Sequence, residues 1–301
     1  MTAVTTARVS VPATSANLGP GFDSLGLALA MRDELEGELT GSGVVVEVTG
    51  AGAGEVPLDE SHLVVRAMRV AFDALGEAPA GLRLRCANVV PHARGLGSSS
   101  AAIVGGLVLA RALVDGGAER LDDRAVLDLA VGMEGHPDNV APALLGGFVI
   151  SGTDPRDGSS YAVRSAVDAR VGTVVFVPAE PVSTELARGL LPPTVPHADA
   201  AAAAGAAALL VAALAGDVDQ LWRGTRDTLH QHYRRPAMPD SLDLVERLRA
   251  DGVPAVVSGA GPTVLAFVLD GDDDLAPLCP PGWQHHILAI DPEGARATVL
   301  G

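Results

Sequence analysis

The sequence predicts an α+β fold with two domains. Predicted helices and strands mix along the chain without a strict β–α–β repeat, which argues against a doubly wound parallel sheet. The 301 residues are 48% hydrophobic, which is enough for two domains with buried cores. Aromatic residues make up only 3% of the chain, so the cores must consist mainly of Ala, Val and Leu.

In the first half, β-branched or alternating runs predict strands, and apolar residues at helical spacing predict helices. A short strand over 8–11 is expected to end at Pro12, and a glycine-rich loop follows it. Further strands are expected at 44–48, 82–90 and 146–151, and helices at 62–75, 99–114 and 123–133.

A stretch rich in Asp, Gly and Ser at 153–160 marks the expected domain boundary. We therefore divide the chain into an N-terminal domain, 1–157, and a C-terminal domain, 158–301. In the second half we expect strands at 172–177, 255–258, 264–269 and 286–289, and helices at 184–190, 200–215 and 242–250.

The formal net charge of −16 excludes several kinds of partner. A surface this acidic repels DNA, RNA and anionic lipid, so no nucleic-acid or membrane partner is expected. All 21 basic residues are Arg, and none is Lys. The chain can therefore form neither a lysine Schiff base nor a Walker-A lysine contact. Arg, a metal ion and backbone amides would have to meet the charge of any nucleotide.

The two cysteines, Cys86 and Cys279, lie far apart in the sequence and have no second thiol nearby. A disulfide framework is not expected, so a reducing cytoplasm is the default location. The N-terminus lacks the pattern of a signal peptide. The longest apolar run, 200–216, is mostly Ala, and we expect it to be too short and too weakly apolar to span a bilayer. It predicts a helix packed on a sheet, with Asp199 near its N-cap.

The most informative stretch follows the predicted strand 82–90 and opens the next predicted helix. Gly95 and Gly97 permit backbone angles closed to other residues and let phosphate oxygens approach the chain. Three serines then occupy the first helical turn, where free N–H groups and the helix dipole favour an anion. The alternative is a Gly/Ser-rich turn without a ligand. Phosphate is expected on Pro91, His92, Ala93, Arg94, Gly95, Leu96, Gly97, Ser98, Ser99, Ser100 and Ala101.

Three motifs together resemble those of the superfamily of galactokinase, homoserine kinase, mevalonate kinase and phosphomevalonate kinase. One is the stretch 91–101, and the others are Val-Pro-Ala-Thr-Ser-Ala-Asn-Leu-Gly-Pro-Gly-Phe-Asp at 11–23 and Val-Ser-Gly-Ala-Gly-Pro-Thr at 257–263. Their order and spacing fit, and together they span most of the chain. The resemblance implies ATP and Mg²⁺ as cofactors. It also implies that 1–157 is an N-terminal ATP-binding kinase domain, like the second domain of a ribosomal small-subunit protein, and that 158–301 is a ferredoxin-like C-terminal kinase domain.

Within this superfamily the chain is most similar to the homoserine kinases. The N-terminal motif has their Pro-Ala-Thr-Ser-Ala-Asn form, not the Pro-Gly-Arg or Pro-Gly-Lys of sugar and mevalonate kinases. The string Glu-Gly-His-Pro-Asp-Asn-Val-Ala-Pro-Ala at 134–143 matches the same family, and 183–188 and 229–234 resemble its two arginine segments. The resemblance implies phosphorylation of the L-homoserine hydroxyl to O-phospho-L-homoserine, in threonine biosynthesis.

The resemblance also implies a set of substrate-pocket residues. Homoserine is a zwitterion, so its carboxylate suits two guanidinium groups and its ammonium suits carboxylate or amide oxygens. The individual alternatives are ordinary: an Arg at a helix end is often a solvated charge, and Asp23 could only stabilise its own turn. Arg235 beside Arg234 leaves a one-residue ambiguity. The expected pocket residues are Asn17, Asp23, His136, Asn139, Thr184, Arg188, Arg234 and Gly259.

Mg²⁺ is expected on Ser99 and Glu134, with Ser98 as the alternative hydroxyl and Asp128 as the alternative carboxylate. The expected catalytic residues are Asp138 and Asn139. Asp138 matches the position of a general base in some superfamily members. A loose transition state requires little nucleophilicity of the attacking hydroxyl, so a base is not essential. The alternative is that Asp138 only orients Asn139 or its loop.

Two rival hypotheses remain beside this interpretation. One is a kinase of the same superfamily acting on another alcohol; the N-terminal motif, the paired arginines and the absence of Lys count against it. The other is a non-catalytic ligand sensor, but the phosphate loop, Glu134, Asp138 and Asn139 are all present. Family members are often homodimers, so a homodimer is also an expectation. Residues 57–62 are expected on the adenine side of the site.

Overall fold

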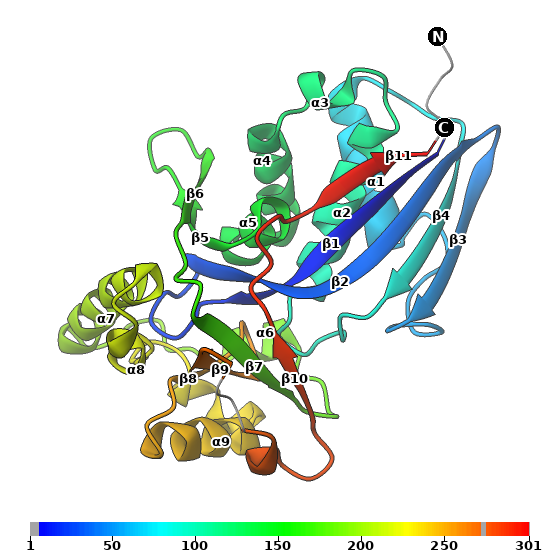
Figure 1. The fold of residues 1–301 in the computed structure, drawn as a ribbon. Helices are drawn as coiled ribbons and strands as arrows, with labels where there is room; N and C mark the ends of the chain where they lie inside the picture. The colour runs from blue at the N-terminus through cyan, green and yellow to red at the C-terminus, as the bar shows by residue number, and fades with distance from the viewer. Residues whose placement is uncertain (1–5, 272–274, 301) are drawn as a thin grey trace.

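Two sheets organise the computed structural model, which describes residues 6–271 and 275–300 (Figure 1). The first is a seven-stranded sheet in the order β11-β1-β2-β4-β3, with β5 on β2 and β6 on β5, and the second has the order β10-β7-β9-β8. The α+β fold class predicted from the sequence is confirmed. The strands of the first sheet are β1 (Thr6–Ala16), β2 (Leu25–Thr40), β3 (Gly43–Gly50), β4 (Gly81–Asn88), β5 (Phe148–Thr153), β6 (Ser160–Ser165) and β11 (Arg296–Val299).

The second sheet is antiparallel throughout, and its strands are β7 (Val171–Val177), β8 (Ala255–Val257), β9 (Val264–Leu269) and β10 (Gln284–Leu288). Helix α9 (Pro239–Ala250) packs its leucines and Val245 on one face. The opposite face joins a second core that includes Leu27 and Phe148 of the first sheet. The two sheets therefore share apolar packing.

Helices cover one face of the first sheet (Figure 1). Helix α2 is apolar on nearly all sides because it lies between the sheet and its neighbouring helices, as its composition predicts. A Cβ added to Gly106 of α2 would lie 2.6 Å from the Val64 carbonyl oxygen, so glycine permits the close approach of α1. The helices are α1 (Leu63–Leu75), α2 (Ser98–Ala112), α3 (Gly117–Arg120), α4 (Asp123–Glu134) and α5 (Pro137–Leu145).

Strand β1 does not end at Pro12, and that expectation is wrong. The strand continues to Ala16, with a shift in register between Pro12 and Ala13: Pro12 pairs with Arg32, and Ala13 with Leu29. An irregularity of this kind tolerates the missing proline N–H and turns the strand. The end of β1 and the loop after it thereby reach the second sheet.

The Asp- and Gly-rich stretch at 153–160 forms the turn between β5 and β6, which pair in the first sheet. The change from one sheet to the other therefore falls between Ser165 and Val171, later than the boundary expected at residues 157 and 158. Strand β11 also returns to the first sheet beside β1. Arg32 braces this return, because its guanidinium pairs with Asp291 and donates to the Ser10 carbonyl at 2.8 Å.

The remaining α-helices in the described residues belong to the second half: α6 (Thr184–Gly189), α7 (His197–Ala215) and α8 (Leu221–Gly224). A short 3-10 helix over His232–Ala237 carries Arg234. In the described residues α7 is the single helix long and apolar enough to cross a membrane, with a mean hydropathy of 1.8. It begins at His197 and has 19 residues, so the expectation that this run is too short is wrong. Asp199 lies in its first turn, after the N-cap Pro196. One such helix is weak support for a membrane span, and Leu210 and Leu214 of α7 are fully buried in the second core.

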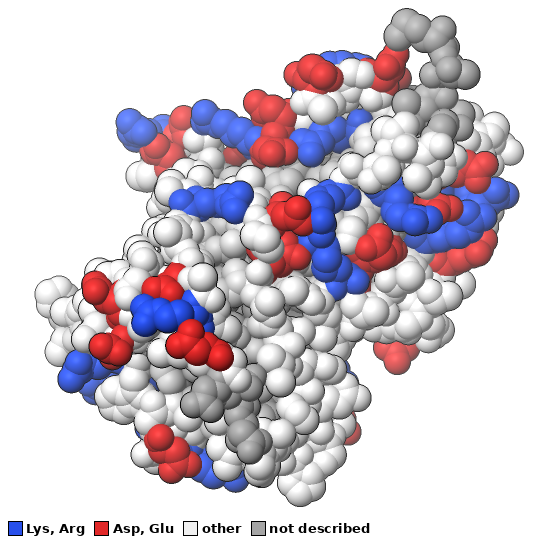
Figure 2. All heavy atoms as spheres, viewed as in Figure 1, with Lys and Arg blue, Asp and Glu red and all other residues white. Residues whose placement is uncertain are grey.

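Charged side chains of opposite sign are interspersed over the first sheet (Figure 2). Glu36 on β2 accepts hydrogen bonds from Arg8 and Arg85 on its two neighbouring strands, at 2.9 and 2.7 Å. Such exposed pairs contribute little stability individually, about 0–1 kcal/mol. These pairs do hold arginines beside carboxylates on the exposed face of the sheet.

Candidate active site

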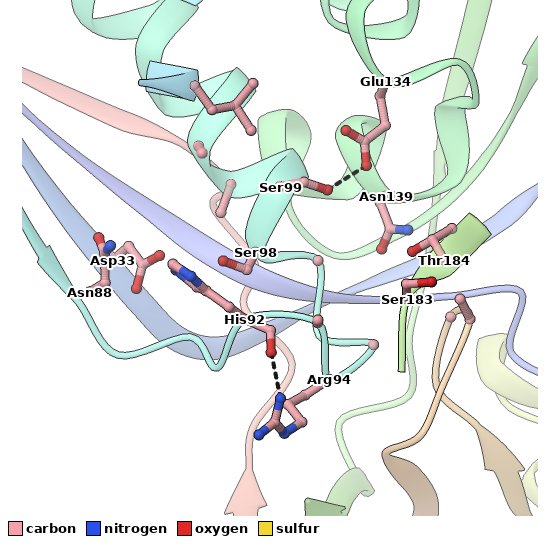
Figure 3. Close-up of a pocket in the computed structure, with 18 of the residues that line it drawn as sticks. Asp33, Asn88, His92, Arg94, Ser98, Ser99, Glu134, Asn139, Ser183 and Thr184 are labelled. Atoms are coloured by element: carbon pink, nitrogen blue, oxygen red, sulfur yellow. Dashed lines mark hydrogen bonds between the residues drawn. The ribbon is translucent and has the colours of Figure 1, made fainter. Parts of the chain in front are cut away.

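A cavity of about 490 Å³ lies where the two sheets meet, and segments from both line it (Figure 3). The start of α2 contributes Ser98 and Ser99, and the end of α4 contributes Glu134. The second half contributes Thr184 and Arg188 of α6, together with Arg234, Gly259 and Ala260. The cavity therefore depends on segments that are far apart in the sequence.

The phosphate loop has the backbone that its glycines predict. Gly95 and Gly97 have φ values of +77° and +69°, which favour glycine. A Cβ on Gly95 would lie 2.3 Å from the Ser258 carbonyl oxygen, and a Cβ on Gly97 would lie 1.9 Å from Thr14 Oγ1. Gly97 is the N-cap of α2 and makes no side-chain capping bond. The first N–H groups of α2 are thus free of side-chain partners, and the helix dipole favours an anion there.

The second half of the chain holds this loop in place. Ser258 Oγ donates to the Gly95 carbonyl at 2.6 Å, and the Thr263 amide donates to the Arg94 carbonyl at 3.2 Å. The Arg94 guanidinium donates to the carbonyl oxygens of His92 at 2.9 Å and Pro178 at 3.0 Å, so its charge is directed at main chain and braces the loop (Figure 3). Of the residues 91–101, those that do not line the cavity are Pro91, Leu96 and Ser100.

Glu134 and two of the loop serines meet at the end of α4. Ser99 Oγ lies 2.7 Å from Glu134 Oε1 (Figure 3). Ser100 Oγ lies 3.0 Å from the same oxygen. Asp128, one and a half turns earlier, accepts the Ser160 amide at 2.7 Å and is not among the residues that line the cavity. Within residues 6–271 and 275–300, no three His, Cys, Asp or Glu side chains form a metal cluster.

A hydroxyl and a carboxylate oxygen at this spacing fit Mg²⁺, which prefers oxygen ligands. Mg²⁺ in kinases is commonly bound by one or two carboxylates together with substrate phosphates and water. The donor set of Ser99 and Glu134 therefore matches a metal that arrives with a nucleotide.

The start of α5 carries a buried hydrogen-bonded pair beside the cavity. Asp138 is 1% exposed, and its Oδ1 lies 3.0 Å from His136 Nδ1. Burial lowers the pKa of His136, but the hydrogen bond to Asp138 and the charge of Asp138 raise it by more, so the net pKa is raised. Asn139 Oδ1 accepts the Thr14 hydroxyl at 2.8 Å. Its amide nitrogen therefore remains as the donor available to the cavity, beside Thr184 (Figure 3).

The loop between β1 and β2 brings Asp23 to Arg188. Arg188 Nη2 lies 2.6 Å from Asp23 Oδ1, and Nη1 lies 3.2 Å from Oδ2. Asn17 shapes this loop: its Oδ1 accepts the Asp23 amide at 3.0 Å, and its Nδ2 donates to the Gly259 carbonyl at 2.9 Å. Asn17 and Asp23 both have left-handed backbone angles, which Asn and Asp tolerate better than most residues. Arg188 lines the cavity, whereas Asp23 is not among the lining residues, so the pair borders the cavity through its arginine.

The structure separates Arg234 from Arg235. Arg234 lines the cavity and is 1% exposed, and burial lowers its pKa to about 10. Arg235 instead pairs with Asp243 and Glu246 on α9. Arg234 is therefore the member of the doublet that belongs to the site.

Asp33 and Asn88 line the cavity near the phosphate loop, although neither belongs to the expected set. Asp33 is 5% exposed, and its Oδ1 accepts the Val89 and Val90 amides at 2.6 and 2.9 Å; Asn88 and His92 lie beside it (Figure 3). Pro57 and His62 also line the cavity; both belong to the segment 57–62, which is expected to contact adenine. The alternation of β2 places Asp33 on the same buried face as Leu35, opposite Glu34 and Glu36, so this period of two is the signal that could have found it.

Comparison with known proteins identifies the family. Residues 62–147 match the model of the GHMP kinases N terminal domain, and residues 206–276 match that of the GHMP kinases C terminal domain. A homoserine kinase of Streptomyces coelicolor is 55% identical over 294 residues, covering 97% of this chain and 94% of that protein. A homoserine kinase of Leifsonia xyli is 48% identical over 294 residues, covering 95% and 90%.

Solved structures agree with these relatives. The crystal structure of a homoserine kinase from Cytophaga hutchinsonii has a TM-score of 0.84 at 26% identity and covers 97% of each chain. A mevalonate diphosphate decarboxylase from Staphylococcus aureus has a TM-score of 0.72 at 16% identity, covering 98% of each chain, which shows a shared fold. The chain belongs to the homoserine kinase family of the GHMP kinases.

Proposed function

We propose that the chain transfers the γ-phosphate of MgATP to the side-chain hydroxyl of L-homoserine and releases O-phospho-L-homoserine and ADP. One observation carries the proposal: a helix N-terminus suited to phosphate and a charge pair suited to a zwitterion line or border one cavity. We infer L-homoserine as the acceptor because the similar proteins from Streptomyces coelicolor and Leifsonia xyli are homoserine kinases. The step belongs to threonine biosynthesis.

ATP would enter with its phosphates on the uncapped N–H groups of α2 and its base toward His62. The chain has no Lys that could bind a phosphate, and the Arg94 guanidinium already donates hydrogen bonds to carbonyl oxygens. Backbone amides and a metal must therefore meet most of the triphosphate charge. Ser98 lines the cavity in the first turn of α2, and its hydroxyl can donate a hydrogen bond to a phosphate oxygen.

Ser99 and Glu134 would hold Mg²⁺ through one hydroxyl and one carboxylate oxygen. When bound, the metal neutralises charge on the β- and γ-phosphate oxygens. The hydrogen bond between Ser99 and Glu134 keeps both oxygens at the phosphate end of the cavity. Ser100 donates to the same carboxylate oxygen and supports it from the buried side of α2.

Homoserine would place its two charged groups against Asp23, Arg188 and Arg234. Asp23 suits the ammonium, and the two guanidinium groups suit the carboxylate because each can donate two parallel hydrogen bonds. The hydroxyl tail would then point toward Asn139 and His136, near the start of α5. Asn17, Thr184 and Gly259 would complete the wall around the substrate.

Phosphoryl transfer depends mostly on alignment and on stabilisation of charge. Asn139 offers its amide N–H, since Thr14 occupies its oxygen. Asp138 lies within the lining and is bonded to His136, so it can accept the hydroxyl proton or only orient His136. The two roles predict different losses of rate when Asp138 is replaced by Asn.

The test is ADP release from MgATP by the purified protein, with one acceptor at a time. We expect a strong rate with L-homoserine and little with L-threonine, L-serine, mevalonate or galactose. Activity on another acceptor, without a homoserine-dependent rate, would refute L-homoserine as the substrate. The assignment as a kinase would still hold. No activity with any acceptor would support a sensor.

We also propose that the enzyme acts in the cytoplasm and forms a homodimer. The isolated thiols support the first statement, because Cys86 is buried and Cys279 lies in another part of the fold. The frequent dimers of the family support the second. Light scattering after size-exclusion chromatography would give about twice the chain mass of 30.5 kDa for a dimer.

A further inference from the structure

A buried histidine, His230, links the two halves of the acceptor site. Its Nε2 lies 2.8 Å from the Gly19 carbonyl oxygen, and its Nδ1 lies 3.0 Å from Arg234 Nη1. Gly19 belongs to the β1–β2 loop that carries Asp23, whereas Arg234 lies in the second half of the chain. The imidazole is fully buried and therefore makes both contacts without competition from solvent.

These partners fix the protonation state of His230. A carbonyl oxygen only accepts, so Nε2 must carry a proton; a guanidinium only donates, so Nδ1 must be an unprotonated acceptor. The ring is therefore neutral and of a single tautomer. Burial lowers its pKa, which agrees with the neutral form.

The contact orients the guanidinium of Arg234. Its Nη1 donates to two acceptors, His230 Nδ1 and the Gly259 carbonyl, both at 3.0 Å. Its Nε is buried and has no partner among the described residues. A buried donor without a partner costs about 1–3 kcal/mol. A substrate carboxylate on the Nε edge would satisfy that donor, so the fixed Nη1 presents the other edge of the fork to the ligand.

Asp227 holds His230 in turn. The Asp227 side chain is fully buried, and its carboxylate accepts the backbone amides of Leu229, His230 and Gln231 at 2.8, 3.1 and 2.7 Å. Three backbone donors fix the turn from which the imidazole projects. The Asp227 charge also raises the pKa of Arg234 against the larger effect of burial.

The β1–β2 loop fits tightly against this turn. A Cβ added to Gly19 would lie 2.6 Å from the Thr225 carbonyl oxygen, so glycine is needed for the loop to approach. Phe22 packs on His230 with ring centroids 5.2 Å apart, and the Cζ atoms of Arg188 and Arg234 lie 5.4 and 5.7 Å from the centroid of the Phe22 ring. A change at His230 is thus transmitted to both arginines and to the residue next to Asp23.

We propose that His230 is a positioning residue for the acceptor site: it fixes Arg234 for the substrate carboxylate and ties that arginine to the loop carrying Asp23. The inference rests on the proposed function. It gives His230 no role in the chemistry of transfer and none in binding ATP.

Two substitutions separate the two hydrogen bonds of the ring. In His230→Asn, an amide oxygen can occupy the place of Nδ1 and accept from Arg234. In His230→Gln, an amide nitrogen can occupy the place of Nε2 and donate to Gly19, but the acceptor for Arg234 is lost. The matched control is His232→Gln, because His232 is exposed and lies in the same segment.

We expect His230→Gln to raise KM for L-homoserine by about 10- to 100-fold, the effect of one hydrogen bond to a charged group. His230→Asn should raise it less, and both should leave KM for ATP and kcat within about 2-fold. Calorimetry should give the same order for homoserine affinity. In a double-mutant cycle, His230→Gln should add little to the loss caused by Arg234→Lys.

An unchanged homoserine KM in both variants, or equal increases in the two KM values, would overturn the positioning role. A lower melting temperature with unchanged KM would mean that His230 is only structural. These results require a homoserine-dependent rate in the unsubstituted protein, and the absence of that rate would refute the proposed function instead.

Discussion

Arg188 and Asp23 form a two-point ion pair at the border of the cavity, with Arg188 Nη2 2.6 Å from Asp23 Oδ1. Both side chains are about one-third exposed, so the pair remains open to exchange with a ligand. Homoserine carries the same two charges as this pair on one carbon. Substrate binding can therefore replace one ion pair with two, ammonium to Asp23 and carboxylate to Arg188, without leaving a buried charge alone.

Arg188→Ala should raise KM for L-homoserine far more than KM for ATP, by about 10- to 100-fold, because a charge-assisted hydrogen bond is lost. Steady-state kinetics with each substrate varied in turn would measure both constants. The control is Arg235→Ala, since Arg235 pairs with Asp243 and Glu246 and should leave both constants unchanged. Equal effects of Arg188→Ala on the two KM values would refute the assignment of Arg188 to the homoserine carboxylate.

Glu134→Gln should raise the free Mg²⁺ concentration needed for half-maximal rate by at least about 10-fold, because an amide replaces a charged ligand. Rates at saturating ATP over a range of free Mg²⁺ would show it. Asp128→Asn is the control, as that carboxylate accepts the Ser160 amide outside the cavity. If Asp128→Asn changes the magnesium dependence and Glu134→Gln does not, the metal ligand is Asp128.

Gly97→Ala should weaken ATP binding and lower stability. The added Cβ would lie 1.9 Å from Thr14 Oγ1, and φ is +69° in this position. We expect a loss of about 1–3 kcal/mol in the free energy of unfolding from strain and overpacking. Gly132→Ala is the matched comparison: no atom lies within 4 Å of the added Cβ inside α4, so it should stabilise by about 0.5–1 kcal/mol. Urea unfolding of both variants would contradict this argument if Gly97→Ala were the milder change.

The phosphate loop and the start of α2 were predictable because their signals are contiguous: two glycines, three serines and a following apolar run fix a turn and a buried helix locally. Strand β11 was missed because it has only four residues, all with exposed side chains, and so short a run does not stand out from a loop. Its pairing with β1 depends on contacts between the two ends of the chain. The expected end of β1 at Pro12 failed because an irregularity accommodates the proline.

Within the site, residue types could be predicted more readily than their partners. The doublet of Arg234 and Arg235 has no local feature that selects one, and only burial in the fold separates them. The bond from His230 to Gly19 joins residues 211 positions apart. Arg94 lies inside the phosphate motif, yet its guanidinium binds carbonyl oxygens that the second half of the chain supplies. The partners of Arg234, His230 and Arg94 all depend on how the two sheets pack, which no local sequence pattern encodes.

His62 should make stability depend on pH. Its Nδ1 accepts the Val64 amide at 3.3 Å, which requires the neutral ring, and burial followed by the charge of His92 lowers its pKa. Because the folded pKa lies below the unfolded value of about 6.5, this stability is present above pH 6.5 and is lost as pH falls through the folded pKa. His62→Asn keeps an acceptor that does not titrate. The variant should therefore lose less free energy of unfolding than the unsubstituted protein between pH 7 and 5, and parallel losses would contradict the argument.

Asp138→Asn distinguishes a general base from an orienting group. Proton transfer by a positioned base typically contributes about 10²–10⁴-fold to the rate, so a base at Asp138 predicts a loss of kcat in that range. An orienting role predicts a loss of about 10-fold or less, because the amide can still bond to His136, 3.0 Å away. We expect the smaller loss, since Asp138 is 1% exposed, is already bonded to His136, and faces a transition state that demands little of the hydroxyl. Single-turnover rates at saturating ATP and homoserine would isolate the transfer step. A loss above about 100-fold, with unchanged binding of both substrates, would make Asp138 the base.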